Sequence, residues 1–265
     1  MPSKPLIGFQ PEWPAPPFVK ALMTTRQGGV SGAPWGPLNL GFLSGDKLED
    51  VETNRALVTQ GLGVPAVYLR QVHGAHGVAV DITTPPNTEA DVAWTTQKGV
   101  ACAIMAADCL PILVCHPQAR WVAGAHAGWR GLAGIEGQGV VETLASAALA
   151  QGLAVQDCLV WLGPCIGPTA FEVGADVHAA FQNLLKTARH PTDLFEPTAS
   201  GKYMANLAGL ARERLQQAGF KSLHGNDSSV AWCTYRQEAT YHSHRRDAVA
   251  KGGAGRMAAY IWITA

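Results

Sequence analysis

The sequence predicts a mixed α/β or α+β fold in a single domain that spans residues 1–265. Short apolar segments of strand length alternate along the whole chain with segments of helical periodicity, so strands and helices are not separated into two halves. Charged residues make up only 15% of the chain, below the roughly 25% of an average soluble domain. The 29 glycines supply tight turns between many buried strands.

The first part of the chain is predicted to contain a loop, a helix and a strand. Residues 24–42 form the loop, because glycine and proline are dense there. Residues 47–63 form the helix, because their apolar side chains return to one face and a glycine lies near the end. Residues 66–74 form a strand that ends at His73.

The middle of the chain is predicted to hold three short buried strands followed by a helix. The apolar runs that predict the strands are residues 99–107, 110–115 and 121–126. After a glycine-rich turn, residues 135–152 keep apolar residues at helical spacing. Gly152 suits the end of that helix.

The last third of the chain continues the mixture of helices and strands. The predicted segments are a strand at 158–167, helices at 174–186 and 206–218, and strands at 229–235 and 257–265. Asn206 is a residue type that favours the N-cap of a helix, which supports the start of the second helix. We find no internal repeat and no long linker.

Charge and hydropathy argue against two classes of partner. Twenty basic and twenty acidic residues cancel, whereas a nucleic-acid-binding protein usually has a basic excess, so no nucleic-acid partner is expected. The apolar stretch at 100–115 is broken by Asp108 and Pro111 and is too short to span a membrane. The proline-rich N-terminus has no apolar run of signal-peptide length. We expect a cytoplasmic protein with six unpaired cysteines; the sequence assigns no oligomeric state.

Three chemically active side chains stand at or just past the ends of apolar strands: His73, Cys109 and His126. Two imidazoles and one thiolate suit Zn²⁺ and leave the fourth tetrahedral position open, as in a catalytic zinc site. Their spacing along the chain matches no standard zinc motif. The alternative is that Cys109 is a core thiol and the two histidines bond to the backbone.

Four arginines are candidates for binding phosphate or another anion. Arg245 and Arg246 form a pair in SHRRD, and paired guanidiniums bind phosphate well. The pair can equally be a surface ion-pair cluster with Asp247. Arg26 and Arg130 lie in glycine-rich loops, and the loop of Arg130 leads into a helix, whose N-terminus favours anions.

Two further polar residues are candidates for the site. Asn39, in the segment PLNLG, is expected either to contact a ligand or to cap its own loop. Asp108 directly precedes Cys109. A carboxylate there suits a catalytic acid or a partner that orients a histidine ligand.

Nine short motifs occur in the order typical of one protein family. They are TTRQGGVSG, LNLG, VETNR, RQVHG, AADCLPILV, AHAGWRG, GPCIG, CTY and SHRRD, followed by GR near the C-terminus. From about Thr24 to Arg256 the chain resembles the YfiH family, also called laccase-domain or polyphenol-oxidase-like proteins. The resemblance implies a layered α/β/β/α sandwich with mixed sheets, related to the catalytic domain of cytotoxic necrotising factors.

The resemblance also implies a site and an activity. The metal ligands of the family correspond to His73, Cys109 and His126, and the implied cofactor is Zn²⁺. Family members act on purine nucleosides, by phosphorolysis of adenosine, inosine, guanosine and methylthioadenosine and by deamination of adenosine. The expected partners are therefore purine nucleosides and phosphate, with an arginine such as Arg26 or Arg245 holding the phosphate.

Three other functions are compatible with parts of the sequence. The first is a Cys–His hydrolase, such as an amidase acting on peptidoglycan precursors, with Cys109 as nucleophile and His126 as base. The second is a copper polyphenol oxidase, which would need several His-x-His pairs, whereas the chain has only the pair of His242 and His244. The third is a zinc-stabilised binding protein, which would need a closed site with four ligands.

Overall fold

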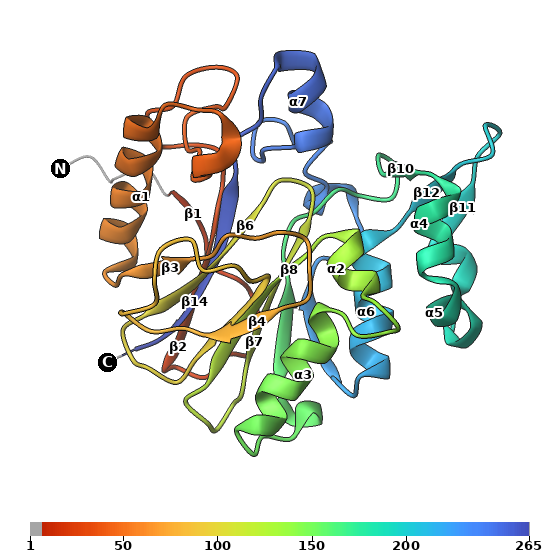
Figure 1. Cartoon of the computed structure of the whole chain (residues 1–265), viewed down its shortest axis with the longest axis horizontal. Helices are drawn as coiled ribbons and strands as arrows, with labels where there is room; N and C mark the ends of the chain where they lie inside the picture. Colours follow the sequence, from red (N-terminus) through yellow and green to blue (C-terminus); the bar gives the residue numbers. More distant parts are fainter. Residues whose placement is uncertain (1–6, 265) are drawn as a thin grey trace.

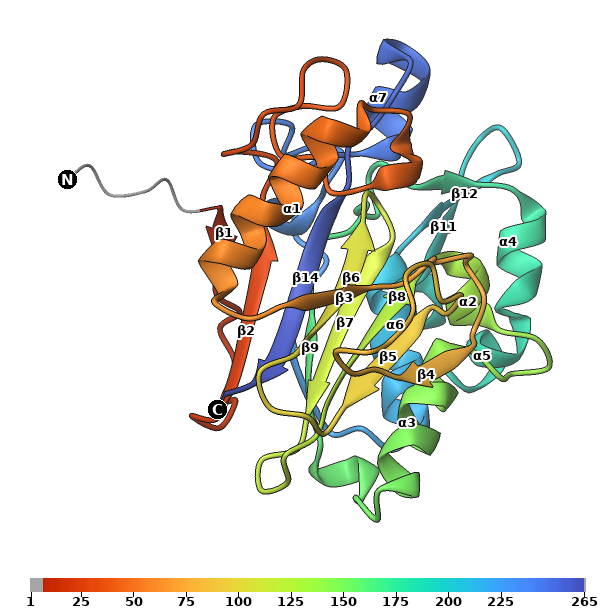
Figure 2. The same cartoon turned by 60° about the vertical axis from the view of Figure 1, so that its left-hand side comes forward.

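The computed structural model describes residues 7–264. The first six residues of the N-terminal stretch and the last residue of the strand predicted at 257–265 lie outside the described part. Two large sheets lie face to face, and helices cover their outer faces (Figure 1 and Figure 2). The predicted mixture of strands and helices is confirmed. Within the described residues, no helix combines the length and the apolar character needed to cross a bilayer.

The first sheet has the order β1-β2-β14-β6-β3. Its strands are Gly8–Phe9, Val19–Thr24, Met257–Ile263, Ala101–Ala106 and Ala66–Tyr68. The sheet is mixed, because β3 is parallel to β6 while the other neighbours are antiparallel. Helix α1 (Leu48–Leu62) covers the outer face, where Val58 lies in one buried cluster with Tyr260.

The second sheet has the order β13-β9-β7-β8-β5-β4. Its strands are Ser222–Gly225, Leu159–Leu162, Leu110–Cys115, Val122–Ala127, Val92–Thr95 and Gly77–Ala79. Every residue of β7 and β8 is buried, which explains why both read as continuous apolar runs. Helices α2 (Trp129–Ala133), α3 (Val140–Ala150) and α6 (Leu207–Gln217) cover the outer face of this sheet (Figure 1).

The inner faces of the two sheets share one buried core. Met23 and Ile104 from the first sheet lie in the same cluster as Leu113, Val122 and Trp161 from the second. The layers therefore run α1, first sheet, second sheet, α3 with α6, as the family resemblance implies. The relationship to the necrotising-factor domain stays a prediction.

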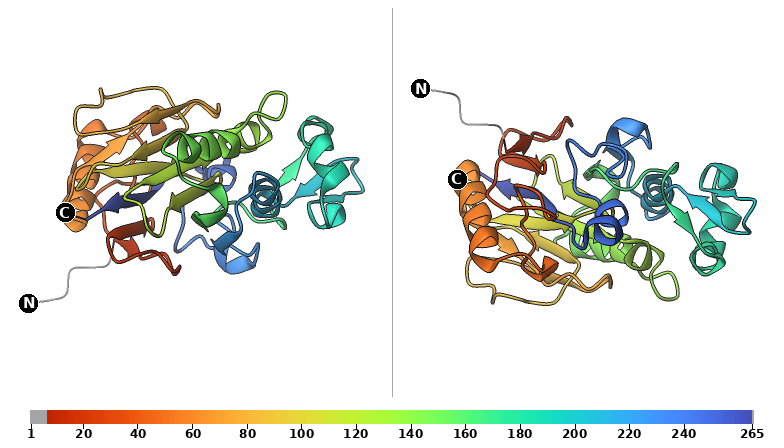
Figure 3. Two further views of the ribbon diagram at one scale, coloured as in Figure 1. Left: turned by 90° about the horizontal axis from the view of Figure 1, so that it is seen from below. Right: turned by 90° about the horizontal axis from the view of Figure 1, so that it is seen from above.

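A third, smaller sheet lies to one side of the sandwich (Figure 1 and Figure 3). Its order is β10-β12-β11, formed by Glu172–Val173, Tyr203–Ala205 and Phe195–Pro197. The helix predicted at 174–186 is divided here into α4 (Ala175–Ala180) and α5 (Gln182–Thr187). Phe181, at the junction, is buried and has backbone angles outside the helical range. Short 3₁₀ helices complete the chain at Phe42–Ser44, Val155–Asp157, Pro191–Asp193 and Val230–Trp232.

Most predicted elements are confirmed, some with shorter bounds. The loop at 24–42 leads into α1, and β6, β7, β8, α6 and β14 occupy the predicted segments. Asn206 caps α6, because its side chain accepts a hydrogen bond from the Gly209 N–H. The strands predicted at 66–74 and 158–167 end early, at Tyr68 and Leu162, and the helix predicted at 135–152 begins only at Val140.

Two segments near the C-terminus correct the sequence analysis. The prediction of a strand at 229–235 is wrong, because Val230–Trp232 forms a 3₁₀ helix. The backbone of Cys233 makes only an isolated parallel β-bridge, to the backbone of Cys165. The SHRRD motif itself begins helix α7 (His244–Lys251), which was not predicted; Ser243 is its N-cap. Only Asp247 is buried in α7, so this helix has no apolar periodicity to reveal it.

Candidate metal centre and its cavity

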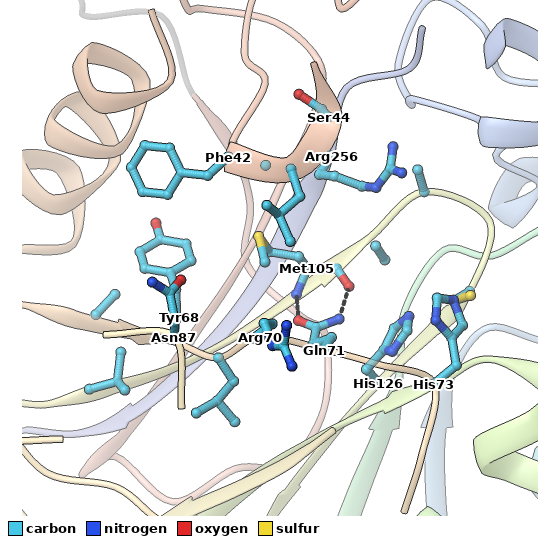
Figure 4. Close-up of a pocket in the computed structure, with 18 of the residues that line it drawn as sticks. Phe42, Ser44, Tyr68, Arg70, Gln71, His73, Asn87, Met105, His126 and Arg256 are labelled. Carbon is cyan, nitrogen blue, oxygen red and sulfur yellow. Dashed lines mark hydrogen bonds between the residues drawn. The ribbon is translucent and has the colours of Figure 1, made fainter. Parts of the chain in front are cut away.

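His73, Cys109 and His126 converge at one place on the second sheet. Their ligand atoms all lie within 4.8 Å of one another. Cys109 directly precedes β7 and His126 lies near the end of β8, and the antiparallel register of these strands pairs Pro111 with His126. His73 reaches the same point from the segment after β3 (Figure 4). The three side chains can therefore hold one metal ion.

Two unusual backbone conformations and one glycine allow the three side chains to lie close together. His73 and Asp108 have positive φ angles of 62° and 84°, which residues other than glycine rarely adopt. Gly128 lies directly beside the group. A Cβ atom at Gly128 would lie 2.8 Å from His73 Cδ2 and 3.1 Å from Cys109 Sγ. The glycine of the AHAGWRG motif thus leaves the space that the ligand side chains occupy.

Asp91 belongs to the candidate site and was missed by the sequence analysis. Its carboxylate is fully buried and accepts a hydrogen bond from His126 Nδ1 at 2.8 Å. It also accepts bonds from the backbone N–H groups of Val72, His73 and Gly74, at 3.2, 3.0 and 2.8 Å. One carboxylate therefore fixes the ring of one candidate ligand and the backbone of another.

The charges of the group favour the form of Cys109 that binds a metal. Burial alone would raise the pKa of the Cys109 thiol, but the charge and hydrogen bonds of His126 and His73 outweigh it and lower this pKa to about 6. Burial likewise opposes the charged form of His126, yet Cys109 and Asp91 raise the His126 pKa to about 9. A lowered thiol pKa suits a metal ligand and also a nucleophile.

The donor set fits Zn²⁺. Two imidazoles and one thiolate are typical zinc donors, and the cluster within residues 7–264 contains three such groups, which leaves a fourth position for another ligand. Because His126 Nδ1 donates to Asp91, its Nε2 is the nitrogen available to a metal. The identity of the metal stays a prediction.

His73, Cys109 and His126, called the metal group below, lie at one end of a cavity of about 740 Å³. Figure 4 shows His73 and His126 at one end and Phe42 with Tyr68 at the other. Between them, the Gln71 side chain is held by the Met105 backbone, donating to its carbonyl oxygen and accepting from its N–H, both at 2.8 Å. A volume of this size is typical of sites for small-molecule ligands.

Of the four arginines proposed for anion binding, only Arg245 lines this cavity. Its Nη1 donates to the Glu172 carbonyl oxygen at 3.0 Å. Arg256, which the sequence analysis did not select, also lines the cavity, close to the metal group (Figure 4). Burial lowers the pKa of Arg256, while the negative charges of Cys109 and Asp108 raise it.

The other three arginines are not brought to the cavity. Arg26 donates from Nη1 to the Glu238 carbonyl oxygen, and Arg130 is exposed with its guanidinium carbon 4.3 Å from the ring centroid of Trp129. The Arg246 guanidinium donates its hydrogen bonds to groups within the protein. The acceptors are the carbonyl oxygens of Thr234, Tyr235 and Tyr241 and the carboxylate of Asp247. Of the alternatives for Arg246, the structure favours the ion pair with Asp247.

Asn39 is buried and caps its loop. Its amide group donates to Ser44 Oγ and to the Asp46 carboxylate, at 2.7 and 2.9 Å. Its oxygen accepts from the backbone N–H groups of Gly41 and Arg256, at 3.0 and 2.9 Å. The loop-capping alternative therefore describes Asn39, which positions Gly41, Ser44 and Arg256 in the cavity wall without lining the cavity itself.

Asp108 does not orient a histidine ligand, which corrects that expectation. Its carboxylate accepts from the hydroxyls of Thr234 and Ser243, at 2.6 and 3.0 Å, and from the Arg245 backbone N–H at 2.6 Å. The candidate ligand His126 donates from Nδ1 to the Asp91 carboxylate instead. Asp108 joins the turn that carries Cys109 to the start of α7, which carries Arg245.

The fold and the site define a mixed α/β protein with several mixed sheets and a His-Cys-His group able to hold a metal. A family model described as "Multi-copper polyphenol oxidoreductase laccase" matches residues 20–264, and the chain belongs to this family, the YfiH family of the sequence analysis.

Curated relatives resemble the chain over nearly its whole length. The Pseudomonas aeruginosa protein "Purine nucleoside phosphorylase PA4543" is 42% identical over 254 residues, covering 96% of this chain and 97% of that protein. The Escherichia coli K12 protein "Purine nucleoside phosphorylase YfiH" is 39% identical over 255 residues, with coverage of 96% and 97%. The family description names an oxidase, whereas these relatives carry phosphorylase names.

Solved structures show the same fold. The crystal structure of Neisseria meningitidis protein NMB0706 superposes with a TM-score of 0.85 at 39% identity, covering 98% of this chain and 100% of that one. The crystal structure of YlmD from Geobacillus stearothermophilus superposes with a TM-score of 0.84 at 32% identity, with coverage of 98% and 100%.

Proposed function

We propose that the protein is a metal-dependent purine nucleoside phosphorylase that uses Zn²⁺ held by His73, Cys109 and His126. The observation that carries the proposal is the convergence of these three side chains, within 4.8 Å, at the end of a cavity large enough for a nucleoside. The phosphorylase names of relatives at 39–42% identity support the reaction class. Adenosine, inosine, guanosine and methylthioadenosine are the proposed substrates, with deamination of adenosine as a second reaction.

In phosphorolysis, a phosphate oxygen attacks C1′ of the ribose and the bond from C1′ to N9 of the purine breaks, with its electron pair leaving on the base. Arg245 and Arg256 line the cavity and supply the positive charge that would hold the phosphate. Asp91 keeps the His126 ring oriented. When bound, the metal supplies Lewis-acid chemistry at the end of the cavity where we place the base.

Two measurements test the proposal together. The first is the zinc content of the wild-type protein and of His73→Ala. The second is the identity of the products formed from adenosine with and without phosphate. Phosphate-dependent release of adenine supports phosphorolysis, and phosphate-independent formation of inosine supports deamination. Absence of both reactions in zinc-loaded protein would reject the proposal.

A Cys–His hydrolase, such as an amidase acting on peptidoglycan precursors, is the second candidate. The lowered pKa of the Cys109 thiol beside His126 favours it, because the thiolate is the nucleophilic form. Turnover of an amide substrate by protein stripped of metal would support this candidate. Activity that requires one metal ion per chain would argue against it.

A further inference from the structure

The end of the cavity farthest from the metal group is built around one arginine. Arg55 projects from α1, and its guanidinium carbon lies 4.0 Å from the ring centroid of Phe42 and 3.8 Å from that of Tyr68. All three residues line the cavity, and Phe42 and Tyr68 lie opposite His73 and His126 (Figure 4). The two aromatic rings hold the guanidinium plane in position.

The hydrogen bonds of Arg55 leave one amino group available. Its Nε donates to the Leu40 carbonyl oxygen at 2.9 Å, and its Nη2 contacts Met105 Sδ at 3.6 Å. Nη1 has no hydrogen-bond partner among residues 7–264, and it is not one of the fully buried polar atoms that lack a partner. Arg55 lines the cavity, so we take Nη1 as the group that would meet an anion bound there.

Arg55 also lacks an acidic partner among the described residues. Within the described part of the chain, no carboxylate lies within ion-pair distance of its guanidinium. Arg70, which also lines the cavity, differs because it is exposed and paired with Glu89. Partial burial of a cation without an acidic partner destabilises the protein, and a bound anion would offset that destabilisation.

We propose that this end of the cavity binds an anionic group at the 5′ position of a purine nucleoside, so that purine nucleoside 5′-monophosphates are ligands. The assignment rests on the proposed function, which places the base at the metal group. In a purine nucleoside, C6 of the base and C5′ of the ribose lie at opposite ends of the molecule. A base at the metal group therefore directs the 5′ substituent toward Phe42, Tyr68 and Arg55.

A purely structural role for Arg55 is the competing explanation, since its stacking and its bond to Leu40 tie α1 to the first sheet. The two roles differ in what they predict for ligands. A structural arginine gives inosine and inosine 5′-monophosphate equal affinity. An arginine that binds the 5′ group gives the monophosphate higher affinity, and removing its charge abolishes that difference.

The experiment is a calorimetric titration of the full chain with inosine and with inosine 5′-monophosphate in phosphate-free buffer, where neither ligand is phosphorolysed. In wild-type protein we expect the monophosphate to bind about tenfold more tightly, equivalent to about 1.4 kcal/mol. Arg55→Gln should reduce the ratio to about one. Arg120→Gln is the matched control, because Arg120 also stacks on an aromatic ring, that of Phe18, but lies outside the cavity lining; it should leave the ratio unchanged.

Two further variants keep the test decisive. His73→Ala should retain the preference for the monophosphate, because Arg55 lies at the other end; loss of the preference there would place the phosphate at the metal and overturn the proposal. If Arg55→Gln does not fold, Arg55→Lys replaces it and should lower the ratio, because lysine keeps the charge but not the planar fork. The proposal is also overturned if wild-type protein binds inosine and inosine 5′-monophosphate with nearly equal affinity, or if the Arg55 variant keeps the wild-type ratio of the two affinities.

The binding experiment on Arg55 and the turnover assay of the proposed function can fail independently of each other. An Arg55-dependent preference without turnover of any nucleoside would keep the anionic subsite and reject the reaction. Turnover of nucleosides without the preference would keep the reaction and reject the subsite.

Discussion

The Asp91 carboxylate joins His126 to the backbone that carries His73. Its oxygen Oδ1 accepts from His126 Nδ1 at 2.8 Å and from the His73 N–H at 3.0 Å. A hydrogen bond of this kind orients a histidine ligand and makes it a better donor to a metal. Because Asp91 is fully buried, each of these bonds is protected from competition with water.

Asp91→Asn should weaken zinc binding by about 10- to 100-fold. Asparagine presents one oxygen and one NH₂ group, so it cannot accept all of the bonds that the carboxylate accepts, and it leaves buried N–H groups unpaired. Zinc affinity measured by competition with a chelator tests this. Asp81→Asn is the control, because the side-chain hydrogen bonds found for Asp81 among residues 7–264 join it to Thr83 and Thr84 and not to the metal site. Equal affinity in the two variants would contradict the role of Asp91.

Cys109→Ala should remove both the metal and the turnover. Two imidazoles without the thiolate lack one of the three protein ligands of a catalytic zinc site, so bound zinc should fall from about one ion per chain to a small fraction. Elemental analysis of purified protein and nucleoside assays measure the two effects. Cys102→Ala is a matched control, because that cysteine is buried in the core between the sheets. Retained turnover in Cys109→Ala would reject the metal mechanism.

Gly128→Ala should disturb the metal site by steric conflict alone. The backbone of Gly128 has φ −68° and ψ 158°, which alanine adopts readily, but the added Cβ would meet His73 Cδ2 at 2.8 Å and Cys109 Sγ at 3.1 Å. We expect zinc affinity to fall by at least about tenfold. Gly32→Ala is the control, since a Cβ there meets nothing within 4 Å. Unchanged zinc affinity in Gly128→Ala would show that the ligands do not need this space.

His242 should make the protein less stable in acid. It is fully buried and donates from Nε2 to the Leu38 carbonyl oxygen, while Nδ1 has no hydrogen-bond partner among residues 7–264. Burial, with the charges of Arg26 and Arg256, lowers its pKa to about 3 against the opposing effect of Asp247. Below pH 6.5 the unfolded chain takes up a proton at His242 and the folded chain does not. The unfolding free energy therefore decreases as pH falls from 6.5 toward 3.

Comparison with His242→Gln isolates this contribution. Denaturant unfolding at pH 7 and pH 5 should show that the wild-type protein loses about 2 kcal/mol more than the variant over this interval. A glutamine side chain has no proton to gain in this range. Identical pH dependence in the two proteins would mean that the pKa of His242 is the same in the folded and the unfolded chain, which would contradict the prediction.

The three candidate metal ligands could be predicted from sequence, whereas Asp91, which holds two of them in place by hydrogen bonds, could not. His73, Cys109 and His126 stand at the ends of apolar runs, and the family motifs that contain them imply that they are metal ligands, although their spacing alone matches no standard zinc motif. Asp91 is one acid before a short strand, and only the pairing of β5 with β8 brings it to His126. That pairing joins segments distant in sequence, so no local pattern reveals it.

The arginines show the same limit. Arg245 and Arg246 are adjacent in sequence, yet Arg245 lines the cavity while the Arg246 guanidinium bonds to the Asp247 carboxylate and to backbone carbonyl oxygens of the preceding loop. Neighbours on a helix point in different directions, and α7 itself was not predicted because it lacks an apolar stripe. Which arginine faces a ligand depends on that helix. Arg55 and Arg256 were likewise visible only once the cavity was defined.

Arg245→Ala should impair the use of phosphate while leaving zinc bound. Arg245 lines the cavity, but its side chain makes no contact with the Asp91 carboxylate that supports the metal group. We expect the KM for phosphate to rise by about tenfold, the loss of one charge-assisted hydrogen bond. Steady-state phosphorolysis at varied phosphate, with zinc content measured in parallel, tests this. Arg130→Ala is the control, since Arg130 is exposed and outside the cavity lining; an unchanged KM in Arg245→Ala would transfer the phosphate site to Arg256.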